Sequence, residues 1–162
     1  MRKLGLIGFA GSGKTSVLNE AKQSGFKTLD TDEMLLACNV DVSSLIMAGN
    51  FEKMRQFEKN VVIRALNSLT DVIAFGGGFH QGHCVWEYVN TSSVEIIFLE
   101  KSFENCIQRT LDRPLLKKLG LDKYRDLYEK RQNKYRDACE RVIKTDGKTI
   151  SEVWSDIQEK WN

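Results

Sequence analysis

The feature that most constrains this chain is a phosphate-binding loop close to its N-terminus. Residues 8–15 have the sequence GFAGSGKT, which matches the pattern GxxxxGKS or GxxxxGKT in full. A short apolar run at residues 3–8 predicts a buried strand before the loop, and helical spacing at residues 14–24 predicts a helix after it. The motif requires this strand–loop–helix context. We therefore expect the chain to bind the phosphates of a nucleotide, as a GTPase, an ATPase or a kinase.

The parts of this loop have separate chemical roles. Glycines allow backbone N–H groups to turn inward around phosphate oxygens, and the N-terminus of the following helix adds positive potential. The Lys14 side chain can reach the β- and γ-phosphates, and the Thr15 hydroxyl can bind Mg²⁺. The guanine-selecting motif NKxD is not found, since residues 133–136 have the sequence NKYR. A motor or large ATPase needs more than 162 residues, so the size favours a small-molecule kinase.

Short apolar runs alternate with helical patterns along the chain. Strands are expected at residues 3–8, 26–29, 71–75, 94–99 and 141–145. Helices are expected at residues 14–24, 103–109, 122–139 and 150–161, and over 31–69 with breaks near 39–41 and 49–50. This alternation predicts one domain over residues 1–162, a three-layer α/β/α sandwich with a five-stranded parallel sheet. Because ligands bind beyond the carboxyl ends of such strands, the loops at residues 8–15, 30–32 and 76–78 should meet at the site.

Composition argues against several classes of protein. Lys and Arg number 24 and Asp and Glu 22, a balance that disfavours a dedicated nucleic-acid binder. No apolar run approaches the length of a membrane span. The N-terminus starts like a signal peptide, but its apolar run is short and leads into the glycine loop. The four cysteines form no CxxC pair, which predicts reduced thiols. We therefore expect a cytoplasmic protein with no membrane or nucleic-acid partner.

The segment Asp30-Thr31-Asp32 follows the second expected strand and has two interpretations. In the first, one carboxylate orients Mg²⁺ through water, and the other binds a substrate hydroxyl and accepts its proton. In the second, Thr31 or Asp32 caps a helix at residues 33–37. The residues by themselves favour neither interpretation.

Two arginines and a run of glycines are also open to two interpretations. Arg55 and Arg131 lie in charged helices, where a solvated face is the common role and where Arg55 could pair with Glu58. The alternative is that they bind a ligand. The three glycines at residues 76–78 either expose backbone for close approach to a ligand or form a plain loop.

Two further loops and the last helix complete the set of candidates. Residues 111–121 form a polar, mobile-looking stretch, either a surface loop or a flap that closes over the site and brings in Arg113. The sequence HQGHC at residues 80–84 is a weak metal signal without a second ligand cluster, so a surface or substrate-rim role is favoured. Trp154 and Trp161 share a helix face and should anchor the core.

Taken in order, these segments resemble the shikimate kinase family nearly from end to end, from Lys3 to about Trp161. The marks of the resemblance are GSGKT at residues 11–15, LDTD at 29–32, Arg55 with Glu58, GGG at 76–78, RPLL at 113–116, and Arg131 with Tyr135. The resemblance implies a monomeric fold of the P-loop nucleoside-monophosphate-kinase type. It also implies transfer of the γ-phosphoryl group of ATP to the 3-hydroxyl of shikimate, in the biosynthesis of chorismate and the aromatic amino acids.

The resemblance assigns expected roles to individual residues. The phosphates of ATP would be held by Gly11, Ser12, Gly13, Lys14, Thr15 and Ser16, and Mg²⁺ by Thr15 and, through water, Asp30. Shikimate would be bound by Asp32, Arg55, Gly76, Gly77, Gly78 and Arg131. Asp32 is the expected base, and the two arginines would hold the carboxylate. Arg109 would lie against the adenine. Arg113, on a lid at residues 111–121, would reach the transferring phosphoryl group and join Lys14 and Asp32 as a catalytic residue, while residues 31–69 would form the substrate-binding region.

Two departures from the family pattern keep other functions in view. Met54 precedes Arg55 where a Phe is frequent, and Phe75 precedes the glycines where a small hydroxylated residue is common. One alternative is a kinase for another small hydroxy acid such as gluconate. The other is a kinase-like binding or regulatory module without turnover. The catalytic set argues against this alternative, since it is intact at Lys14, Thr15, Asp32 and Arg113.

Overall fold

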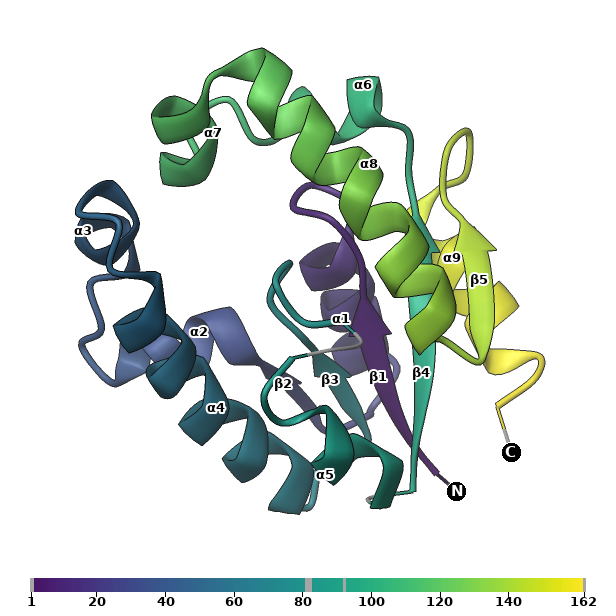
Figure 1. Cartoon of the computed structure of the whole chain (residues 1–162). Helices are drawn as coiled ribbons and strands as arrows, with labels where there is room; N and C mark the ends of the chain where they lie inside the picture. Colours follow the sequence, from purple (N-terminus) through teal and green to yellow (C-terminus); the bar gives the residue numbers. More distant parts are fainter. Residues whose placement is uncertain (1, 81–82, 92, 162) are drawn as a thin grey trace.

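The computed structural model, which describes residues 2–80, 83–91 and 93–161, contains an all-parallel sheet (Figure 1). Its strands are β1 (Lys3–Ile7), β2 (Thr28–Asp30), β3 (Val72–Ala74), β4 (Val94–Glu100) and β5 (Arg141–Lys144). Their order across the sheet is β2-β3-β1-β4-β5. The central strand β1 lies between β3 and β4. The connections lead to β2 and β3 on one side of β1 and to β4 and β5 on the other, so the strand order reverses at β1. In sheets of this kind, the crevice at such a point receives the ligand.

Helices cover both faces of the sheet and create three layers, as the sequence predicts (Figure 1). They are α1 (Lys14–Gln23), α2 (Thr31–Ala37), α3 (Val42–Met47), α4 (Phe51–Asn67), α5 (Trp86–Thr91), α6 (Phe103–Ile107), α7 (Pro114–Leu119), α8 (Leu121–Ala138) and α9 (Ile150–Gln158). On one face, α1 and α9 pack against the sheet, and Trp154 and Trp161 are buried there, which confirms their expected core role. The expected shared helix face is wrong, because α9 ends at Gln158 and Trp161 lies beyond it. The other face is covered by α4, α5, α6 and α8. None of the helices that the structure describes is long and apolar enough to cross a membrane.

Left-handed backbone conformations divide the long helical region where breaks were expected. Asn39 has φ 56° after α2, and Gly49 has φ 71° after α3. The next helices then start at side-chain caps, because Asp41 accepts a hydrogen bond from the Ser44 N–H and Asn50 accepts one from the Lys53 N–H. These turns lead α2, α3 and α4 out beside the sheet as one substructure.

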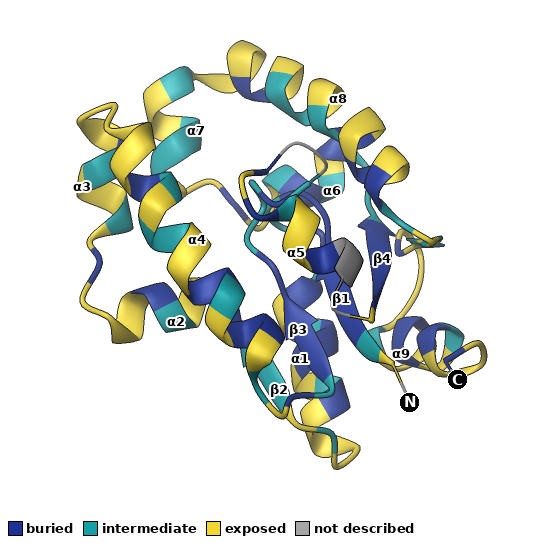
Figure 2. Cartoon of the chain, turned by 60° about the horizontal axis from the view of Figure 1, so that its bottom comes forward, coloured by how far each residue is buried: buried dark blue, intermediate teal, exposed yellow. Residues whose placement is uncertain are grey.

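Two short helices differ from the sequence-based expectation. The stretch at residues 111–121 is not irregular throughout, since it contains α7, and α5 was not predicted at all. Pro114 starts α7, where its missing N–H has no partner to lose, and Gly120 with φ 77° ends it. No residue of α7 is buried, and Figure 2 shows this helix without the dark blue of buried residues. The segment is therefore a helix at the rim of the molecule that turns into α8 at a glycine.

Candidate active site

A cavity of about 410 Å³ lies beyond the carboxyl ends of β1, β2 and β3, within the usual range for small-molecule sites. Its walls come from the phosphate loop, the substructure α2–α4, the glycine loop after β3, and the segment from α6 to α8. The expected site residues that line it are Gly11, Gly13, Lys14, Thr15, Ser16, Asp30, Asp32, Arg55, Gly77, Gly78, Arg109, Arg113 and Arg131. Of the expected set, all of which the structure describes, only Ser12 and Gly76 are not in this lining.

The phosphate loop closes tightly at the end of β1. At Gly11, with φ 85°, a Cβ would lie 2.4 Å from the Cys106 carbonyl oxygen, so only glycine fits. The buried Lys14 ammonium donates to the carbonyl oxygens of Gly8, at 2.8 Å, and Phe9, at 3.1 Å. Burial lowers the pKa of Lys14 to about 8, against the opposing charges of Asp32 and Asp30. The loop therefore holds a cation among backbone groups at the N-terminus of α1.

Asp30 joins the phosphate loop to the next element of the site. One of its carboxylate oxygens accepts a hydrogen bond from the Thr15 hydroxyl at 2.9 Å. The other accepts from the Asp32 N–H at 2.9 Å and caps α2. The interpretation that Thr31 or Asp32 caps this helix is therefore wrong. The helix begins at Thr31, directly after the strand, and its cap is Asp30. Hydroxyl and carboxylate oxygens are ligands that Mg²⁺ prefers, so Thr15 and Asp30 fit this ion.

Asp32 lies where α2 faces the cavity, and the glycine loop leaves room for it. A Cβ at Gly76 would lie 2.7 Å from Asp32 Oδ1, and the Gly76 N–H donates to the Thr31 hydroxyl at 3.0 Å. Asp32 is open to solvent through the cavity. The surrounding protein nevertheless displaces enough water to raise the pKa of Asp32, and this effect outweighs the positive charge of Lys14, which lowers the pKa. A carboxylate with a raised pKa is suited to accept a proton during a reaction.

Arg55 is held between a carboxylate and a glycine. Its Nη1 atom lies 2.5 Å from Glu58 Oε2, which confirms the expected pairing. On its other side, a Cβ at Gly78 would lie only 2.3 Å from Nη1. Arg55 is therefore not a freely solvated side chain of α4, because it lines the cavity in a confined position.

Glu58 has a second partner that the sequence did not reveal. Its Oε2 lies 3.6 Å from His83 Nε2. Burial would raise the pKa of Glu58, but the nearby His83 ring and the charge of Arg55 outweigh burial and lower it. His83 belongs to the loop that was considered as a weak metal signal, of which Gln81 and Gly82 lie outside the described residues. No spacing rule connects His83 with Glu58, since they meet only through the packing of α4.

On the opposite wall, α8 connects Arg131 to the glycine loop. The Arg131 guanidinium carbon lies 5.9 Å from the Phe9 ring centroid. The Nη1 atom of Arg131 would lie 3.9 Å from a Cβ placed at Gly77. One turn later, the buried Tyr135 hydroxyl donates to the Gly77 carbonyl oxygen. Arg55 and Arg131 thus approach adjacent glycines from different helices, as a site for one anionic group would require.

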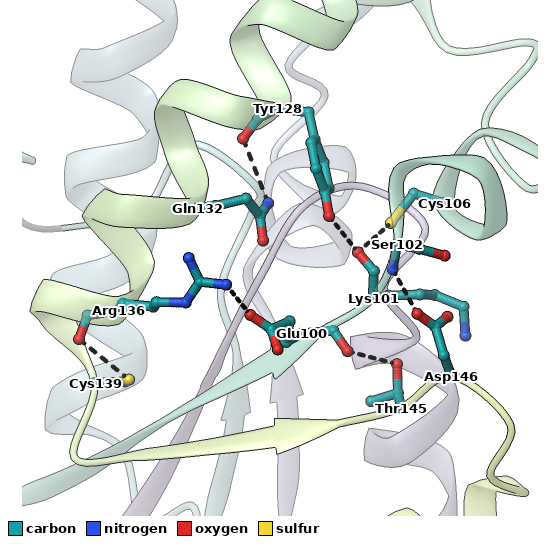
Figure 3. Close-up of polar contacts among 10 residues, drawn as sticks. All are labelled: Glu100, Lys101, Ser102, Cys106, Tyr128, Gln132, Arg136, Cys139, Thr145 and Asp146. Atoms are coloured by element: carbon teal, nitrogen blue, oxygen red, sulfur yellow. Dashed lines mark hydrogen bonds and ion pairs between the residues drawn. The ribbon is translucent and has the colours of Figure 1, made fainter.

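Polar contacts attach α8 and the segment after β5 to the end of β4 (Figure 3). The Tyr128 hydroxyl donates to the Lys101 carbonyl oxygen at 2.7 Å, and the Ser102 N–H donates to Asp146 at 2.8 Å. The Thr145 hydroxyl donates to the Glu100 carbonyl oxygen at 3.1 Å. These bonds fix the start of α6, the helix that leads to Arg109 and Arg113 at the cavity.

Comparisons with known proteins agree with this arrangement. Residues 10–162 match the protein-family model described as shikimate kinase. The shikimate kinase of Thermodesulfovibrio yellowstonii is 30% identical over 99% of this chain and 95% of that protein. That of Caldanaerobacter subterraneus subsp. tengcongensis is 33% identical over 97% of this chain and 94% of that protein.

Solved structures show the same fold. The shikimate kinase from Aquifex aeolicus has a TM-score of 0.79 and 25% identity, and the alignment covers 97% of this chain and 94% of that one. The shikimate kinase from Acinetobacter baumannii in complex with shikimate has a TM-score of 0.85 and 23% identity, with 98% and 92% covered. The P-loop nucleoside-monophosphate-kinase-like fold expected from the sequence is confirmed. Since the family model spans nearly the whole chain, this protein belongs to the shikimate kinase family.

Proposed function

We propose that this chain transfers the γ-phosphoryl group of ATP to the 3-hydroxyl of shikimate, giving ADP and shikimate 3-phosphate for the biosynthesis of chorismate and the aromatic amino acids. Membership of the family supports an ATP-dependent kinase. The observation that carries the proposal is one cavity lined by a phosphate loop, a carboxylate of raised pKa and two arginines from different helices. This set binds two anions and accepts one proton, as phosphoryl transfer to a hydroxy acid requires.

At the nucleotide end, residues 11–16 hold the phosphates of ATP with backbone N–H groups and the Lys14 ammonium. Thr15 and Asp30 would hold Mg²⁺, which when bound neutralises charge on the β- and γ-phosphates. Lys14, now bonded to two carbonyl oxygens of its own loop, turns to the phosphates and stabilises the negative charge of the transition state. Arg109 lies against the adenine.

At the acceptor end, Asp32 takes the proton from the attacking hydroxyl. Its place at the start of α2, next to the glycine loop and within the electrostatic influence of Lys14, supports this role. Arg55 and Arg131 bind the carboxylate of shikimate, and the glycines at residues 76–78 offer backbone donors to it. The whole region at residues 31–69 then forms one wall of the substrate site.

The segment at residues 111–121 acts as a lid that brings Arg113 to the transferring phosphoryl group. Its helix α7 already bridges the cavity mouth, since the Lys118 ammonium donates to the Met47 carbonyl oxygen of α3 at 2.9 Å. This contact supports a lid that closes on the substrate-binding region and excludes water.

The enzyme acts as a monomer in the cytoplasm in this proposal. The monomeric state follows the expectation from the family resemblance. The cysteines Cys38, Cys84, Cys106 and Cys139 are free, which suits a reducing compartment.

A coupled assay of ADP release tests the proposal. ADP release should require shikimate and should be much slower with gluconate. Arg55→Lys and Arg131→Lys should each raise the KM for shikimate and leave ATP affinity unchanged, because an ammonium cannot form the bidentate hydrogen bonds that a guanidinium forms with a carboxylate. Turnover with gluconate alone would favour the other hydroxy-acid kinase, and ATP binding without any turnover would favour a regulatory module.

A further inference from the structure

His83 is a buried titratable side chain that the proposed reaction does not use. It precedes α5, and only 3% of its side chain is exposed. Its Nε2 atom faces Glu58 Oε2 at 3.6 Å, and the same oxygen accepts a hydrogen bond from Arg55 Nη1 at 2.5 Å. One carboxylate oxygen of α4 therefore connects a buried histidine to an arginine that lines the cavity.

The surroundings of His83 determine which ring nitrogen carries the proton. The Val85 backbone N–H points to Nδ1 at 3.4 Å, so Nδ1 accepts and Nε2 carries the hydrogen in the neutral ring. The Phe79 ring lies 5.1 Å from the imidazole centroid and itself stacks on Phe75 at 4.1 Å. The aromatic packing and the backbone bond together direct Nε2–H toward Glu58.

Glu58 in turn confines the cavity arginine. Its side chain is 16% exposed, and its pKa is lowered by its two partners despite burial, so the carboxylate is charged. The Arg55 guanidinium lies between this carboxylate and the backbone at Gly78, and 34% of its side chain remains exposed. The anion on one side and the backbone of Gly78 on the other restrict the orientation of the Arg55 guanidinium.

We infer that His83 is a positioning residue for the acceptor substrate, acting through Glu58 on Arg55. The inference rests on the proposed role of Arg55 in binding the shikimate carboxylate. Without the Nε2–H donor, the Glu58 carboxylate can rotate, and Arg55 then leaves the orientation that suits two-pronged binding. The nucleotide end is on the other side of the cavity, so only the acceptor site should respond.

Three substitutions separate this role from simple filling of the core. His83→Leu keeps apolar volume without a donor, His83→Asn places its amide near Nδ1, and His83→Gln places its amide nitrogen near Nε2. Steady-state kinetics should show that Leu and Asn raise the KM for shikimate about tenfold with kcat within about twofold, since each removes a polar partner from a buried carboxylate. Gln should restore the KM, and the KM for ATP should remain constant in all three variants.

A double-mutant cycle with Arg55→Lys tests whether His83 acts through Arg55. If it does, His83→Leu adds little to the KM increase of Arg55→Lys. Additive increases, or a KM that Gln does not restore, would overturn the inference.

A second measurement separates this inference from the proposed function. Nitrogen-15 NMR of the protein without substrate should show slow rotation of the Arg55 guanidinium, with the signal assigned by its loss in Arg55→Lys. The slow rotation should persist in His83→Gln and disappear in His83→Leu. If the NMR effect occurs without a change in KM, the proposed substrate role of Arg55 fails while its restraint by His83 stands. If Arg55 rotates equally in wild type and His83→Leu, the inference itself is wrong.

Discussion

Gly78→Ala should damage the acceptor site through Arg55 alone. The new Cβ would lie 2.3 Å from Nη1, 2.9 Å from Nη2 and 3.0 Å from Cζ of Arg55. Gly78 does not have a left-handed φ, so alanine fits the backbone, and relief must come from the guanidinium. Restoring an ordinary contact requires a displacement of about 1 Å, and a misplacement of that size at a binding group costs up to about 100-fold in kcat/KM.

We therefore expect Gly78→Ala to lower kcat/KM for shikimate by about 10- to 100-fold, mainly through KM. Binding of ATP in the absence of shikimate and the thermal unfolding midpoint should change little, because the clash involves the mobile end of one side chain. Steady-state kinetics with each substrate varied, isothermal titration with ATP and a thermal melt measure these quantities.

Two comparisons make the result interpretable. At the adjacent Gly77, a Cβ would have its nearest neighbours at 3.4 Å and beyond, so Gly77→Ala should lose far less. In an Arg55→Ala background, Gly78→Ala should cause no further loss, because the atom it displaces is gone. Equal losses at Gly77 and Gly78, or additivity with Arg55→Ala, would refute the reasoning.

Three other outcomes follow from the proposed roles. Lys14 has a pKa of about 8 in the free protein, and bound phosphate favours its charged form. ATP affinity should therefore weaken as the pH rises past about 8, and ATP binding in that range should take up a proton. Titration calorimetry should show this pH dependence in wild type and not in Lys14→Arg, and an equal pH dependence in both would contradict the prediction. Asp32→Asn should bind ATP normally and lose most of its turnover, whereas a full kcat would exclude the base role. Arg113→Ala should lower kcat far more than either affinity, and amide exchange at residues 111–121 should slow with ADP plus shikimate; unchanged exchange together with a normal kcat would leave a plain surface loop.

The phosphate loop and the architecture around it were predictable because their signals are local. The motif at residues 8–15, its flanking strand and helix, and the alternation of apolar runs each depend on neighbouring residues. Parallel strands bring their carboxyl ends to one edge, so the meeting of residues 8–15, 30–32 and 76–78 followed from the sheet alone. The helix breaks near residues 39–41 and 49–50 were likewise visible as turn-forming residues.

Short helices and distant side-chain pairs were decided by the tertiary structure. The helices α5 and α7 have six residues each, too few for periodicity to identify and too short to be stable without packing. The double use of Asp30, as helix cap and partner of Thr15, depends on how α1 and α2 meet. The contact of His83 with Glu58 joins two segments that only the packing of α4 brings together. Sequence patterns report what a residue and its near neighbours prefer, whereas a site built from several segments depends on contacts that form only when the core closes.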